Sequence, residues 1–120
     1  MWLMRDYLPE TADLDARTFP DIDRLVGLLG GDGDIEVVPT SRETPDWTLA
    51  SYWAHPERVL DEDARRATSG IARLEPHVVE RAVDALRRDL EDGTWDAHNG
   101  HLRTLRHLDD VGMRLVVARP

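Results

Sequence analysis

The sequence predicts a mixed α/β chain (α+β within these 120 residues), with several helices and two short strands. Apolar residues recur at helical spacing in two segments, each of which is opened by a proline. Two β-branched runs, Ile35–Val38 and Met113–Ala118, have the length and composition of strands. The length is that of one small domain, so we treat residues 1–120 as a single unit.

The first predicted helix follows Pro20, which suits a first helical turn because its missing N–H is not needed there. Its apolar stripe, at i, i+3, i+4 and i+7, consists of Ile22, Leu25, Val26 and Leu29. Gly30-Gly31 ends this helix. The second predicted helix, which has the stronger pattern, starts at Pro76 and ends at Gly93. Its stripe consists of Val79, Ala82, Val83, Leu86 and Leu90.

The remaining segments have weaker patterns. Trp47–Trp53 is expected to form a helical turn, and Glu57–Leu74 one or two helices with a break near Ser69-Gly70. We expect Trp2–Phe19 to be irregular or weakly helical and Thr94–Asp110 to be mostly loop.

The strand Met113–Ala118 contains Leu115-Val116-Val117, which is apolar on both faces. Such a strand is typical of burial between two layers. A two-stranded ribbon is marginal by itself, so the sequence indicates part of a larger sheet. We expect Ile35–Val38 and Met113–Ala118 to pair antiparallel.

Composition excludes several function classes. The net charge of −9 repels phosphate backbones and anionic lipid surfaces, so neither nucleic acid nor a membrane is an expected partner. The absence of cysteine excludes disulfides and thiolate metal sites and favours a reducing, cytoplasmic location. The first residues lack the pattern of a signal peptide, and no apolar run approaches the length of a membrane span.

Catalytic and cofactor motifs were not found. The glycine cluster Gly30–Gly33 follows a helix and precedes a strand, the reverse of a phosphate-binding loop. His98, His101 and His107 are too loosely spaced for a recognisable metal site. The carboxylates Asp61–Asp63 are typical of a helix start. With no nucleophile elbow either, the chain is not expected to be a self-sufficient enzyme.

Aromatic residues offer two interpretations. Five of the seven lie in Trp2–Tyr7 and Trp47–Trp53. Tryptophan and tyrosine line ligand pockets because they join an apolar ring to a polar group, but the same rings also fill small cores. Burial in the core is the more common of these two outcomes.

Several stretches, in order and spacing over almost the whole chain, resemble one family. They are Trp2–Pro9, Ile35–Pro39, Tyr52–Glu57, Thr94–Asp96, Gly100–Arg103 and Asp110–Ala118. Together they resemble the C-terminal half of bacterial class I S-adenosylmethionine-dependent methyltransferases that act on small molecules. The resemblance implies a Rossmann-like fold in which Ile35–Val38 is the sixth strand and Met113–Ala118 the antiparallel seventh. Residues 47–93 would be a helical insertion on the substrate side.

The resemblance also implies what these 120 residues lack. The family's glycine-rich loop and its ribose-binding acid belong to the N-terminal half, so no S-adenosylmethionine-binding or catalytic residue carries over. Around Glu43–Thr48 only Asp46 keeps the family's residue type. Candidate substrate-pocket residues are Tyr7, Asp46, Trp47, Tyr52 and Trp53.

The expected function is that of a truncated or split methyltransferase-like protein that contributes the substrate side for a small-molecule acceptor. Alternatives are a non-catalytic binding or oligomerisation module and a degenerate remnant. The expected partners are a second copy, joined through strand edges, or a separate cofactor-binding half. We expect that the chain alone neither binds S-adenosylmethionine nor persists as a stable monomer.

Overall fold

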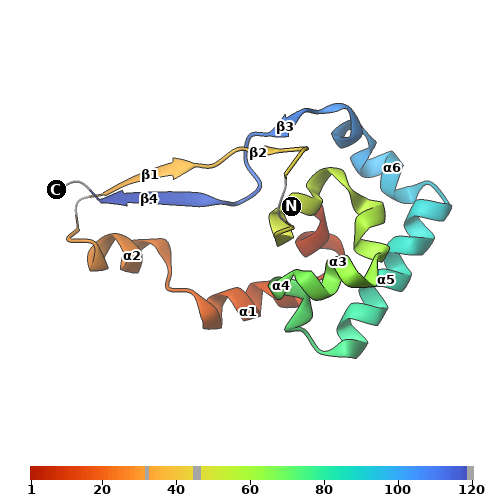
Figure 1. The fold of residues 1–120 in the computed structure, drawn as a ribbon, viewed down its shortest axis with the longest axis horizontal. Helices are drawn as coiled ribbons and strands as arrows, with labels where there is room; N and C mark the ends of the chain where they lie inside the picture. Colours follow the sequence, from red (N-terminus) through yellow and green to blue (C-terminus); the bar gives the residue numbers. More distant parts are fainter. Residues whose placement is uncertain (32, 45–46, 119–120) are drawn as a thin grey trace.

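The computed structural model describes residues 1–31, 33–44 and 47–118 (Figure 1). The helices are α1 (Glu10–Thr18), α2 (Ile22–Leu28), α3 (Glu62–Ala67), α4 (Ser69–Ala72), α5 (Pro76–Glu91) and α6 (Thr94–Asn99). The strands are β1 (Gly33–Val37), β2 (Thr40–Ser41), β3 (His107–Leu108) and β4 (Arg114–Ala118). A π-helical turn covers Leu3–Tyr7, and 3₁₀ helices cover Leu49–Ala54, Pro56–Leu60 and Gly100–Thr104.

The chain forms two unequal parts, which Figure 1 shows side by side. We call residues 20–31, 33–38 and 113–118, which contain α2, β1 and β4, the arm. The other described residues form the helical body. The molecule measures 52 × 32 × 23 Å. Its radius of gyration of 15.9 Å exceeds the value of about 13.6 Å expected for a compact chain of this length, because the arm projects from the body.

The core lies entirely in the helical body. α5 contributes Ala82, Val83 and Leu86 from the predicted stripe, all of them buried. Their partners include the fully buried Trp53 and the N-terminal turn, whose Leu3 is also fully buried. The indole nitrogen of Trp2 donates to the carbonyl of Trp53 at 2.9 Å. This bond satisfies a buried donor and joins the N-terminal turn to the middle of the chain.

In the arm, β1 and β4 pair antiparallel, with Ile35 opposite Val116. The predicted pairing is therefore confirmed, and so is the mixed α/β class. A second, two-residue pair joins β2 to β3 at the base of the arm. Within the described ranges each of these ribbons has two strands, so both edges of the β1–β4 ribbon are free.

The expectation that β4 is buried on both faces is wrong for the described residues. Successive side chains of a strand point to opposite faces. α2 lies on one face near Gly33, where an added Cβ would approach Val26 at 3.8 Å. On the opposite face Leu115 is 51% exposed and Val117 is 37% exposed. No other described element covers these side chains, because the body meets the arm only at its base.

Two segments are more helical than predicted. Glu10–Thr18, within the stretch predicted to be irregular or weakly helical, forms the regular helix α1, with Glu10 and Asp13 placed favourably at the positive end of the helix. Thr94–Asn99 forms α6 within the predicted loop. Gly93 makes that restart possible because its φ of +83° turns the chain directly after α5. The helices α2 and α5 are confirmed, and the break predicted near Ser69-Gly70 falls one residue earlier, at Thr68.

Candidate functional site

Two pockets in the structure contain predicted site residues. The first lies between the N-terminal turn, α5 and α6, has a volume of about 250 Å³ and contains Tyr7. The second lies where the arm joins the body, has a volume of about 460 Å³ and contains Trp47. We call them the Tyr7 pocket and the Trp47 pocket.

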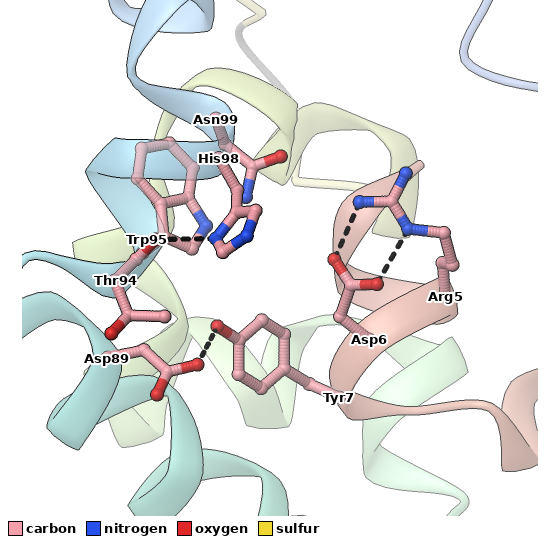
Figure 2. Close-up of a pocket in the computed structure, with 8 residues that line it drawn as sticks. All are labelled: Arg5, Asp6, Tyr7, Asp89, Thr94, Trp95, His98 and Asn99. Carbon is pink, nitrogen blue, oxygen red and sulfur yellow. Dashed lines mark hydrogen bonds and ion pairs between the residues drawn. The ribbon is translucent and has the colours of Figure 1, made fainter.

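In the Tyr7 pocket the tyrosine hydroxyl donates to the carboxylate of Asp89 at 2.6 Å (Figure 2). Burial raises the pKa of Tyr7, and the hydrogen bond to Asp89 raises this pKa further. The phenol therefore stays protonated well above neutral pH and cannot serve as a base or nucleophile there. The same hydrogen bond ties the N-terminal turn to α5.

Other polar groups of this pocket are also paired with one another. Arg5 donates to Asp6 at 2.6 Å, and this hydrogen bond lowers the pKa of the Asp6 carboxyl. His98 contacts the carbonyl of Thr94 through Nδ1 at 2.9 Å, so Nδ1 is the donor in that bond. Figure 2 shows the Arg5–Asp6 pair on one side of the pocket and His98 on the other.

The floor of the Tyr7 pocket is the buried indole of Trp95. It meets Trp2 edge to face at 5.3 Å, and the guanidinium of Arg103 lies 4.8 Å from its centroid. The Trp95 indole nitrogen is buried without a hydrogen-bond partner. Trp95 is thus packed between Trp2 and Arg103. Arg5 neutralises Asp6, and the Asp89 carboxylate accepts from the Tyr7 hydroxyl, so the polar groups of this pocket join the N-terminal turn to α5.

The Trp47 pocket has a different character. One wall includes Met113 at the base of the arm and the neighbouring Phe19 of the body, and the other includes Leu49 and Gly70 of the body. Its volume is within the range of roughly 300–1,000 Å³ that small-molecule sites occupy. Its lining is mostly apolar, so it can hold an organic ligand of modest size.

The indole of Trp47 is held in place from several sides. Its centroid lies 5.1 Å from the Tyr52 ring and 5.6 Å from His55. The guanidinium of Arg58 lies 5.1 Å from the centroid of the same indole. Trp47 remains half-buried, so it offers a fixed apolar surface to the pocket.

Tyr52 packs against the Trp47 indole, and both Tyr52 and Trp53 are fully buried. The hydroxyl of Tyr52 pairs with the hydroxyl of Thr68 at 2.9 Å, and burial raises the pKa of Tyr52. The structure thus places Tyr7 and Trp47 in separate pockets, with Tyr52 packed beside Trp47. Asp46 lies outside the described residues.

Of the residues that line the Trp47 pocket, sequence reasoning named only Trp47, and Asp15 and Phe19 are among those that it missed. Both follow from α1, which the sequence pattern did not reveal because Leu14 is its only large apolar residue. The available signal was the Pro9-Glu10 start with a second acid at position 13, which is typical of a first helical turn.

The glycines of the predicted cluster form a turn between a helix and a strand. Gly30 and Gly31, with φ of +104° and +79°, turn the chain from α2 into β1. A Cβ added at either would meet nothing within 4 Å, so these glycines do not mark a close backbone approach. The described residues contain no group of three or more histidines and acids that could hold a metal ion. None of their helices combines the length and the hydropathy needed to cross a bilayer.

Comparisons with known proteins place this fold. A scan against protein-family models and a search of curated proteins both gave no match. Among solved structures, one similar chain is described as a candidate methyltransferase from an antibiotic biosynthesis pathway of Anabaena variabilis. The two superpose with a TM-score of 0.85 at 26% sequence identity, over 100% of this chain and 49% of the other.

The fold of this chain is methyltransferase-like. The likeness extends over the arm and the body together, since the whole chain is covered. This chain spans about half the length of the methyltransferase-like structure that it matches.

Proposed function

We propose that this chain is the substrate-side portion of an S-adenosylmethionine-dependent methyltransferase, corresponding to the C-terminal half of that fold. The residues that hold S-adenosylmethionine belong to a separate cofactor-binding part, because the glycine turn of this chain has the wrong order and geometry for that role. The observation that carries this proposal is the likeness of the full chain to about half of a longer, methyltransferase-like structure.

The arm is the surface that meets the cofactor-binding part. Seven of the nine exposed large apolar side chains among the described residues lie on it. They are Leu28, Leu29, Ile35, Val37, Met113, Leu115 and Val117. Apolar surface gathered in this way marks an interaction site on a soluble protein. The free edge of β4 can add hydrogen bonds to a neighbouring strand in the same contact.

The Trp47 pocket is where the small-molecule acceptor binds in this proposal. It opens at the base of the arm, so an acceptor held there lies next to whatever part docks on the arm. Trp47 contacts the acceptor, Tyr52 packs against Trp47, and the adjacent Trp53 fills the core of the body. Asp46, which directly precedes Trp47 in the sequence, stays a predicted residue of the acceptor site. Tyr7 orders the N-terminal turn through Asp89.

A chimera tests the proposal. The segment of the Anabaena protein on which this chain superposes is replaced by the chain, and S-adenosylmethionine binding is measured by calorimetry beside the parent. We expect the chimera to unfold cooperatively and to bind S-adenosylmethionine with an affinity within about tenfold of the parent. The 120-residue chain alone should give no binding heat.

Matched substitutions sharpen this experiment. Val117 on the arm and Leu105 on the body are each 37% exposed. In the chimera, Val117→Lys places a charge inside the docked surface and should impair folding or cofactor binding, whereas Leu105→Lys should not. A parent that binds S-adenosylmethionine beside a folded chimera that does not would refute the proposal, as would specific binding by the isolated chain.

A second candidate function, a homodimerisation module, is favoured by the two free edges of the β1–β4 ribbon. The same edge on two copies can meet about a two-fold axis and form a four-stranded sheet. This function requires that the dimer persist when a cofactor-binding part is present. If the added cofactor-binding part displaces the second copy, the methyltransferase assignment is favoured instead.

A further inference from the structure

The Trp47 pocket has a charge pattern that specifies its ligand more closely. Asp15, on the last turns of α1, is the one ionisable side chain among the described residues that line the pocket. No hydrogen bond or ion pair engages its carboxylate within the described parts of the chain. Among its described lining residues, the pocket therefore presents one unneutralised negative charge, at the edge of an apolar cavity.

The rest of the lining is apolar or already hydrogen-bonded. Met4, Leu49, Ala50 and Val111 contribute hydrocarbon surface. The hydroxyl of Thr48 pairs with Ser51, and that of Thr68 pairs with Tyr52. Among the described residues no hydrogen bond engages the hydroxyl of Ser69, which is exposed, so it is available to a ligand. A ligand that fits this lining has one apolar body and few polar groups.

No cationic side chain lies among the described residues that line the pocket, so none of them can neutralise Asp15. Arg58 is the nearest guanidinium to Trp47, but it forms an ion pair with Asp61 at 3.1 Å and stacks on the indole. Asp15 is thus left for an external cation. The protein's net charge of −9 acts in the same direction, since it attracts cations and repels carboxylates and phosphates.

We infer that the Trp47 pocket binds a small, mainly apolar amine, whose ammonium group pairs with Asp15 while its hydrocarbon or aromatic body packs against Trp47 and Phe19. This inference rests on the proposed function, because it names the chemical class of the methyl acceptor. It excludes acidic acceptors and phosphorylated acceptors from the same pocket.

Three probes with one ring system test the charge preference: 2-(2-naphthyl)ethylamine, 2-(2-naphthyl)ethanol and 2-naphthylacetate. Binding to the 120-residue chain is followed by amide chemical shifts in two-dimensional NMR. We expect the amine to bind about fivefold more tightly than the alcohol and about tenfold or more than the acid, because an exposed ion pair contributes modestly. The shifts should cluster at Leu49, Gly70 and Gly112.

Variants separate the charge from the cavity. Asp15→Asn should lower the affinity for the amine to that for the alcohol and leave the affinity for the alcohol unchanged. Asp13→Asn removes one negative charge from the same helix, away from the pocket lining, and should change neither the amine affinity nor the alcohol affinity. Ala67→Trp, at an exposed lining position, should fill the cavity and weaken all three probes.

Salt gives a further check, since the preference for the amine should disappear at ~1 M salt, where the screening length is about 3 Å. Equal binding of the acid and the amine, an unchanged amine affinity in Asp15→Asn, or shifts confined to another surface would overturn the inference. These readouts involve no cofactor. If the pocket shows no preference for the amine but the chimera still binds S-adenosylmethionine, only the inferred acceptor class is wrong. If the pocket prefers the amine but the chimera does not bind S-adenosylmethionine, only the methyltransferase proposal is wrong.

Discussion

The helical body and the arm differ in how they treat apolar residues. In the body, large side chains such as Trp53, Leu86 and Trp95 are almost completely buried. In the arm, Leu115 and Val117 have similar or greater hydrophobicity but remain largely exposed. The body thus completes its core within the chain, whereas the arm has apolar surface that is suited to a partner. Stability and association should therefore depend on different residues.

The largest effect should come from truncating matched leucines in the two parts. Leu86→Ala in the body removes a fully buried side chain and should lower the free energy of unfolding by about 2–5 kcal/mol. Leu115→Ala in the arm should change it by less than about 0.5 kcal/mol, because that side chain is half-exposed. Urea denaturation followed by far-UV circular dichroism measures both. Equal losses would contradict the division into body and arm.

Alkaline pH should destabilise the body through its two tyrosines. The sequence has no lysine or cysteine, so Tyr7 and Tyr52 are its only side chains that titrate near pH 10. Burial raises the pKa of both above that of the unfolded chain. The unfolded state therefore ionises first, and the stability present below pH 10 is lost as the pH rises.

The slope should approach at most about 1.4 kcal/mol per pH unit for each tyrosine. Denaturation curves at a series of alkaline pH values measure this slope. Tyr7→Phe should remove the contribution of Tyr7 to the slope. At neutral pH the same variant loses the hydrogen bond to Asp89 and should be less stable by about 1–2 kcal/mol. An unchanged alkaline slope in Tyr7→Phe would contradict the assignment.

Association should respond to the arm and not to the body. We expect the isolated chain to dimerise in the micromolar range through the β1–β4 ribbon. Val117→Lys should raise the dissociation constant by about tenfold or more, whereas Leu105→Lys, at equal exposure on the body, should leave it unchanged. Analytical ultracentrifugation measures both constants. A wild-type chain that stays monomeric at high micromolar concentration would remove the basis for a docking arm.

The smallest effect should come from two glycines with similar backbone strain. Gly93 in the body has a φ of +83°, and Gly112 at the base of the arm has a φ of +98°. Alanine at either position should cost about 1 kcal/mol, since left-handed backbone disfavours a Cβ. In hydrogen exchange, Gly93→Ala should lower protection throughout the body, while Gly112→Ala should lower it in β4 alone. Protection lost everywhere in both variants would show one cooperative unit.

The sequence predicted those helices and strands whose own residues show a clear apolar period or a β-branched composition. The α5 stripe and the paired β-branched strands follow from periodicity and residue type, and both are confirmed. The exposure of Leu115 did not follow, because a residue's preference for burial does not reveal whether a covering element is present. The helix α1 was missed because its polar residues carry almost no apolar period.

The candidate site was predicted only in part for a similar reason. Trp47, Tyr52 and Trp53 lie within seven residues, and their ring chemistry does not distinguish a pocket wall from a core. The 3₁₀ helix Leu49–Ala54 decides the outcome by turning Tyr52 and Trp53 inward while Trp47 precedes it. Asp15 reaches the same pocket from α1, far away in sequence, and only the tertiary fold brings them together.

The uneven placement of the four tryptophans has an optical consequence. Trp2, Trp47, Trp53 and Trp95 all belong to the body, and the arm has none. Intrinsic fluorescence will therefore report the melting of the body and remain nearly blind to the arm. An emission curve that coincides with a probe of strand structure would mean that the two parts unfold together. A separation of the two curves would measure directly how independent the arm is. Because Trp47 lines the larger pocket and Trp95 the smaller one, quenching by an added ligand that disappears in Trp47→Phe would identify the larger pocket without any label.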